Sequence, residues 1–120
     1  MENHVSWVVE VTVKEGQLDA FKALMEEMVS GTSEEPQTLA YEWYISEDGR
    51  SVHIFEKYAD SAATVLHVNG FLAKWAERFM ACADVDRFVV YGDPSAECRG
   101  VLAGFGPTYL GPWGGFSRFS

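Results

Sequence analysis

A carboxylate and an imidazole, those of Glu56 and His67, are the side chains of this sequence best suited to moving a proton. Glu56 lies in a strand-like run, on the side shared with aromatic residues. A carboxylate on a buried strand face costs free energy unless it is paired or functional. Histidine changes its charge near neutral pH, which suits an acid or a base. In one apolar pocket, the two groups could take a proton from a small molecule.

Each of the two residues also has a purely structural explanation. Glu56 could form an ion pair with Arg87 or with a group near Lys57. His67 could cap a carbonyl group or face solvent. The residue pattern leaves these explanations open, and the discriminating observation is whether both side chains reach one open cavity.

Aromatic residues near these two groups predict the walls of a pocket. We expect Ser46 to pair with Ser51 across a hairpin, so that Tyr41 faces Glu56 on one side of the sheet. The predicted pocket residues, from this side and from the helices above it, are Trp7, Val9, Tyr41, Trp43, Tyr58, Phe71 and Trp75. Tryptophans in such positions are often ordinary core residues, so a filled core is an alternative.

Alternating apolar residues predict the strands that must position these groups. The alternation covers residues 5–13 and 85–91. The run 39–58 is typical of a hairpin that turns at residues 46–50.

Helical spacing of apolar residues predicts a helix over residues 17–29. Asp60 is suited to cap a second helix, which Asn69 and Gly70 should interrupt before a further helical stretch over residues 71–80. The resulting order is β-α-β-β-α-β. It indicates an α+β, ferredoxin-like fold with a four-stranded antiparallel sheet and helices on one face.

The other face of this sheet would be bare in a monomer. We expect it to combine apolar and polar side chains, namely Val8, Tyr44, Phe55, Phe88 and Val90 with Glu10, Glu42 and His53. An apolar patch of that size usually marks an interface. The sequence therefore predicts a homodimer in which a second copy covers the sheet.

The run EPQTLAYEWYISEDGRSVHIFEKYADSAATVLHV resembles the antibiotic-biosynthesis monooxygenase family, the dimeric α/β-barrel proteins that include quinol monooxygenases. Shared features are an acidic residue before Pro36, a Tyr-x-Trp-Tyr strand, Asp-Gly in the hairpin and a Phe-Glu-x-Tyr strand. Asp60 then leads into a helix that carries His67. The resemblance covers about residues 5–91 and is more specific for the fold than for chemistry.

The resemblance implies a cofactor-independent monooxygenase that acts on a quinol or another small phenolic compound. Glu56 or His67 would be the catalytic base, and Tyr41 and Tyr58 would orient oxygen atoms. One alternative is a non-catalytic module that binds a small aromatic molecule in the same pocket. Another is a purely structural dimer with a filled core.

No cofactor or metal is expected from the sequence. It contains no glycine-rich phosphate loop after a strand, and its histidines fall on three different elements. A related branch of the superfamily degrades haem and uses Asn, Trp and His at the positions that align with Val9, Tyr58 and Trp75. All three residues depart from that pattern, which makes haem degradation a poor match.

The charge balance bears on partners and location. The chain has 18 acidic and 9 basic residues, a formal net charge of −9, which disfavours nucleic acid and anionic membranes. No signal peptide and no apolar run near the roughly 20 residues of a membrane span is seen. We expect a cytoplasmic protein whose Cys82 and Cys98 stay reduced, although a disulfide between them is possible on paper.

The sequence divides into a domain over residues 1–91 and a C-terminal extension over residues 92–120. Pro94 and Ser95 could open a short helix that reaches about Ala103. Five aromatic residues then alternate with Gly and Pro: Phe105, Tyr109, Trp113, Phe116 and Phe119. We expect the extension to dock on its own pocket or on the partner subunit, the alternative being a partly disordered tail.

Overall fold

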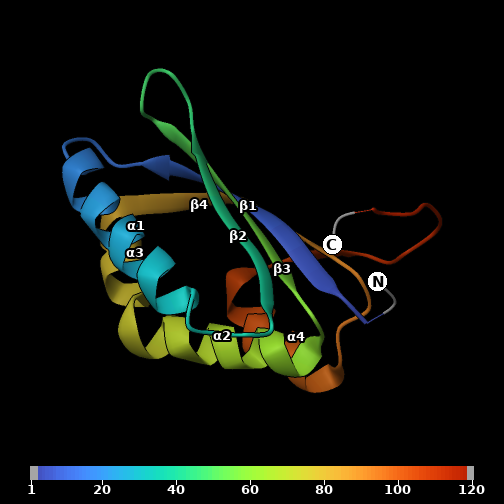
Figure 1. The fold of residues 1–120 in the computed structure, drawn as a ribbon. Coiled ribbons are helices and arrows are strands. Elements are labelled where there is room, and N and C mark those ends of the chain that lie inside the picture. The colour runs from blue at the N-terminus through green and yellow to red at the C-terminus, as the bar shows by residue number, and fades with distance from the viewer. Residues whose placement is uncertain (1–2, 119–120) are drawn as a thin grey trace.

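One sheet with helices on a single face forms the frame of the molecule in a computed structural model, which describes residues 3–118 (Figure 1). The main strands are β1 (Val5–Val13), β2 (Thr38–Ile45), β3 (Ser51–Tyr58) and β4 (Ala83–Tyr91). These four strands pair antiparallel, and the sheet order is β2-β3-β1-β4-β5. The expected ferredoxin-like α+β fold is confirmed.

The sheet has one strand more than the sequence predicts. β5 (Thr108–Leu110) lies parallel to the end of β4, where Val90 pairs with Tyr109. The extension returns along the free edge of β4 and closes part of it. The three residues of β5 lie between Gly and Pro positions, and so short a run shows no apolar alternation from which a strand could be predicted.

The helices are α1 (Leu18–Thr32), α2 (Ser61–Lys74), α3 (Ala76–Cys82) and α4 (Ala96–Leu102), followed by the 3₁₀ turn η1 (Ala103–Phe105). The expected cap at Asp60 is present, since its carboxylate accepts a hydrogen bond of 2.8 Å from the Ala63 N–H. Ser95 caps α4 in the same way through the Cys98 N–H at 3.1 Å. These caps fix where α2 and α4 begin.

The predicted break at Asn69 and Gly70 is wrong, because α2 continues through both residues. The helix ends instead at Trp75, where φ is −128°. A glycine inside a helix costs only about 1 kcal/mol. Buried Val68 and half-buried Phe71 pack into the core on either side of Gly70, which favours continuing the helix there.

Strand register places Tyr41 and Glu56 on the face of the sheet that the helices cover. Ser46 donates a backbone hydrogen bond of 2.9 Å to Ser51, and Tyr41 lies opposite Glu56, as predicted. Trp7 of β1 lies opposite Glu56 from the other side. Three strands therefore bring their side chains to the same place beneath the helices.

Two residues expected on the open face of the sheet lie on the covered face instead. Phe88 pairs with Val9 and Val90 pairs with Trp7, so both point toward the helices. Near its end β4 is apolar on both faces, and the register shift between Glu10 and Val11 leaves Asp86 of β4 outside the residue pairing with β1, which breaks simple alternation along β4. The open face keeps Val8, Tyr44, His53 and Phe55, which line a groove at the surface.

The cysteines are both free and buried. Cys82 belongs to the core cluster beside α1 and α3, and Cys98 to the cluster beside α2 and α4. Within residues 3–118, no helix has both the length and the apolar character needed to cross a bilayer.

Candidate functional site

A largely apolar cavity lies between the sheet and the helices, with a carboxylate and an imidazole in its wall. Its lining residues are Trp7, Val9, Met28, Tyr41, Ile54, Glu56, His67, Val68, Phe71, Phe79, Met80, Val85, Phe88, Leu102 and Phe105. The cavity volume is about 70 Å³, counted as the positions that the centre of a water molecule can occupy. This exceeds what one water needs, so the cavity has room for a small ligand group.

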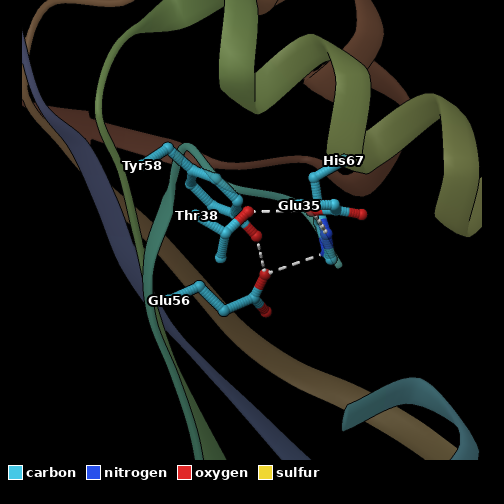
Figure 2. A network of polar contacts seen from close by, with 5 residues as sticks. All are labelled: Glu35, Thr38, Glu56, Tyr58 and His67. Carbon is cyan, nitrogen blue, oxygen red and sulfur yellow. Dashed lines mark hydrogen bonds and ion pairs between the residues drawn. The ribbon is translucent and has the colours of Figure 1, made fainter. Parts of the chain in front are cut away.

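Glu56 is buried at this cavity, with 6% of the residue exposed. Its Oε1 accepts a hydrogen bond from the Tyr58 hydroxyl and lies 3.4 Å from Nε2 of His67. Figure 2 shows that the second carboxylate oxygen, Oε2, points away from both partners. One oxygen of Glu56 is thus held by Tyr58 and His67, while the other is turned away from them.

His67 lies between two carboxylates, one at each ring nitrogen (Figure 2). Nδ1 is 2.9 Å from Oε1 of Glu35, and Nε2 faces Glu56. Glu35 also accepts a hydrogen bond of 2.8 Å from the Thr38 hydroxyl. Because an imidazole donates from both nitrogens only when it is protonated, this setting favours the imidazolium form.

The protonation state of His67 follows from two opposed effects. Burial alone lowers its pKa, but the hydrogen bonds to Glu35 and Glu56 outweigh burial and raise the pKa to about 9. Burial raises the pKa of Glu35, but the hydrogen bond and the positive charge of His67, together with the Thr38 hydrogen bond and the charge of Lys74, leave it below its ordinary value. At neutral pH, His67 is therefore a cation and Glu35 an anion.

Two tyrosines beside the pair are neutral phenols. Burial, followed by the charge of Glu56, raises the pKa of Tyr58 well above its ordinary value and that of Tyr41 likewise. Their rings lie against His67, with centroid separations of 5.2 Å for Tyr58 and 5.5 Å for Tyr41. Both hydroxyl groups can therefore donate hydrogen bonds, but neither supplies an anion.

The structure brings most of the predicted site residues together. Glu56 and His67 reach the same cavity, and Trp7, Val9, Tyr41 and Phe71 line it with them. Tyr58 lies behind Glu56 and holds its carboxylate. The alternative of an ion pair between Glu56 and Arg87 is not realised, because the strand register places Arg87 opposite Glu10, on the face of the sheet away from Glu56.

Two predicted pocket residues lie elsewhere in the core. Trp43 packs against Phe21 and Phe79, and the cavity wall does not include it. Trp75 donates a hydrogen bond of 2.9 Å to Glu27, and its ring lies so close to Gly31 that an added Cβ there would be 2.7 Å away. Trp75 thus fixes the junction of α2 and α3 against α1.

Sequence reasoning missed Glu35 and most of the far wall of the cavity. Glu35 precedes Pro36 in the loop between α1 and β2, where no periodicity indicates which side chain points inward. Leu102 and Phe105 come from α4 and η1, whose docking beside α2 no local pattern shows. The acidic–proline pair before β2 was the only available signal for Glu35.

The residues present bear on metal binding. Among residues 3–118, no three His, Cys, Asp or Glu side chains are grouped so that they could hold a metal ion. What the site does offer is a carboxylate with one oxygen turned away from its partners, a protonated imidazole and two neutral phenols around an apolar space. Such a set can accept a proton from a ligand and stabilise the anion that forms.

Comparison with known families agrees with this fold. The family model described as antibiotic biosynthesis monooxygenase matches residues 5–78, more than half of the 120 residues. The chain therefore belongs to the antibiotic biosynthesis monooxygenase family. No curated protein sequence matches it significantly.

Solved structures with the same fold fall into two groups by coverage. MupZ from Pseudomonas fluorescens is 26% identical with a TM-score of 0.85, and the match covers 97% of this chain and 95% of MupZ. SnoaB from Streptomyces nogalater, described as a cofactor-independent oxygenase, is 16% identical with a TM-score of 0.64, covering 78% of this chain and 96% of SnoaB. SO0527 from Shewanella oneidensis is 25% identical with a TM-score of 0.61, and the match covers 75% of this chain and 88% of SO0527. The MupZ match extends over nearly the whole chain, whereas the other two leave about a fifth or more of it unmatched.

Proposed function

We propose that this protein is a cofactor-independent monooxygenase that acts on a quinol or another small phenolic compound. The observation that carries the proposal is Glu56, held through one oxygen by Tyr58 and His67 at an otherwise apolar cavity. Membership of the family supports it. So does the fold shared with SnoaB, which is described as a cofactor-independent oxygenase.

Glu56 is the base in the proposed mechanism. Its Oε2 takes the proton of a bound phenol, and the resulting electron-rich anion itself supplies the electrons that reduce O2. His67 cannot be that base at neutral pH, because its raised pKa of about 9 keeps it protonated. The imidazolium instead stabilises negative charge as it develops on the substrate.

The apolar wall serves the same chemistry. Aromatic and aliphatic side chains from the sheet, α2, α3 and η1 surround the space next to Glu56. Exclusion of water strengthens the electrostatic effect of His67 and protects a reactive anion from side reactions. A substrate that fits has one polar group for Glu56 and an apolar body for the rest of the cavity.

One observation also favours a second function, an acid–base reaction that does not use O2. A protonated His67 beside the Glu56 carboxyl group can give a proton to one substrate atom while Glu56 removes one from another. Such a pair suits an isomerisation or an internal addition as well as oxygenation. The two functions differ in whether oxygen is consumed.

A substrate screen with and without air tests both functions. Protein checked to be free of metal and flavin is mixed with quinols, polyphenols and related non-aromatic alcohols, and oxygen uptake and substrate loss are recorded. Oxygen uptake that matches substrate loss and stops without air supports the monooxygenase. Substrate loss that continues without air supports the second function. Binding with no loss of any compound contradicts both and indicates a binding module.

A further inference from the structure

We propose that Glu35 is a positioning residue that holds Nδ1 of His67 and thereby directs the Nε2–H of His67 toward Glu56 and the cavity. Glu35 itself does not line the cavity, so it acts only through His67. The inference rests on the proposed function for its catalytic meaning. Its structural content can be tested without any substrate.

The loop that carries Glu35 is closed on both sides, which fixes the carboxylate. The Glu35 N–H donates to the Thr32 carbonyl at 2.9 Å, and the Thr38 N–H donates to the Glu35 carbonyl at 3.1 Å. The Thr38 hydroxyl adds a hydrogen bond of 2.8 Å to Oε1, the same oxygen that faces His67. A side chain that is held at both its backbone and its carboxylate loses little freedom when it orients a ring.

Among residues 3–118, the acceptor that the structure places at Nδ1 of His67 is Glu35. Glu56 and Tyr58 of β3 lie on the Nε2 side, and Tyr41 of β2 contacts the ring edge to face. Lys74, further along α2, acts on Glu35 by its charge rather than on His67. Glu35 is thus the group that determines which ring nitrogen of His67 faces the cavity.

This arrangement has a chemical consequence for the cavity. A carboxylate on the outer nitrogen keeps the proton on Nδ1, so the inner Nε2 is the atom that donates to, or recovers a proton from, a reacting oxygen. It also keeps the ring charged over a wider pH range. Without Glu35, the ring would lose its orientation and its charge at lower pH, although every cavity-lining atom would remain.

The test compares Glu35→Gln with Glu34→Gln, a change at the exposed neighbouring residue. NMR titration of the labelled histidine ring should show the His67 pKa falling from about 9 toward its ordinary 6.5 in the first variant only. Glu35→Asp should restore part of the shift. Thr38→Val, which removes one bond to Glu35, should lower the pKa less. An unchanged His67 pKa in Glu35→Gln would overturn the inference.

Kinetics on a substrate found in the screen then tests the positioning role. In Glu35→Gln, kcat should fall by about 100-fold or more while KM changes little, and the alkaline limit of activity should move to lower pH. Equal kcat and an unmoved alkaline limit would contradict the role even if the pKa shift is seen. If no substrate is found at all, the proposed function fails, while the titration still decides whether Glu35 controls His67.

Discussion

At the scale of single residues, the site is defined by which oxygen of Glu56 and which nitrogen of His67 the protein itself holds. Tyr58 and His67 occupy Oε1 of Glu56, and Glu35 occupies Nδ1 of His67. A carboxylate with one oxygen held and one turned away is oriented without being neutralised. This asymmetry is what separates a proton acceptor from a buried ion pair that serves stability alone.

Replacing Glu56 should therefore lower catalytic turnover strongly and leave the fold largely intact. Glu56→Gln keeps the shape and can still accept the Tyr58 hydroxyl, but it cannot take a proton. Turnover should fall by about 100- to 10,000-fold, measured as initial rate on a substrate from the screen. Glu42→Gln, at an exposed position on β2, is the matched control and should keep the wild-type rate. Wild-type turnover in both variants would remove Glu56 from the mechanism.

The raised pKa of His67 also predicts how stability depends on pH. Because the folded pKa of about 9 exceeds the ordinary 6.5, the stabilisation is fully present below pH 6.5 and is lost as pH rises through 9. Each pKa unit corresponds to about 1.4 kcal/mol, so the loss amounts to a few kcal/mol. Urea unfolding at several pH values measures it.

Two histidine variants serve as controls for that pH effect. His67→Gln should flatten the decline in unfolding free energy between neutral and alkaline pH. His53→Gln, on the exposed face of β3, should leave the decline unchanged. A decline of the same size in both variants would show that another group causes it.

At the scale of secondary structure, the cavity depends on a segment beyond the family match. Leu102 of α4 and Phe105 of η1 close the wall that faces β4. Phe105 lies between Phe71 and Phe88, at a centroid separation of 6.1 Å from each. The first part of the extension thus belongs to the site, whereas its last described residues do not line the cavity.

Phe105→Ala should enlarge the cavity rather than disable it. The variant should bind bulkier phenols than the wild-type protein does, measured as Kd across a size series, while Glu56 and His67 keep their contacts. Loss of a half-buried aromatic ring should also cost about 1–3 kcal/mol of unfolding free energy. Phe116→Ala, an exposed aromatic in the same extension, should change neither quantity. An identical size preference in the two variants would mean that Phe105 does not limit the substrate.

How far the sequence predicts this structure depends on the kind of signal each element carries. β1 and the Asp60 cap follow from alternation and from a local hydrogen bond, and both are observed as expected. Glu56 and His67 could be paired because strand register and helical spacing act together. Glu35, Phe88 and β5 could not be placed, because each depends on tertiary packing. The direction of the Glu35 side chain is set within a loop, the face that Phe88 takes is ambiguous in a strand apolar on both faces, and β5 is a short edge strand.

At the scale of the whole molecule, the sheet is covered on one face and open on the other. The open face exposes Tyr44 to more than half of its possible extent and also carries Val8 and Phe55. We expect a second copy of the chain to cover it, because such a patch is unusual on a monomer. The cavity and its residues all lie on the opposite side of the sheet.

Phe55→Glu should therefore break the dimer without harming the cavity. A charge placed in an apolar interface costs about 3 kcal/mol or more, which weakens association by about 100-fold or more. Light scattering at micromolar concentration measures the change. Leu66→Glu, at an exposed position on α2, is the matched control and should remain dimeric. A wild-type protein that is monomeric at this concentration would contradict the prediction directly.

The last described part of the extension leaves one side chain in an unusual setting. After β5 the chain runs out beyond the sheet (Figure 1). Trp113, in the segment that follows β5, is fully exposed. Trp7 and Trp75 are buried, and Trp43 is half-buried. The emission spectrum of the protein should thus contain a long-wavelength component, open to quenching by iodide, that comes from this one indole. Any partner or second subunit that seats the extension will shift that component to shorter wavelength, so the molecule carries its own optical reporter of docking.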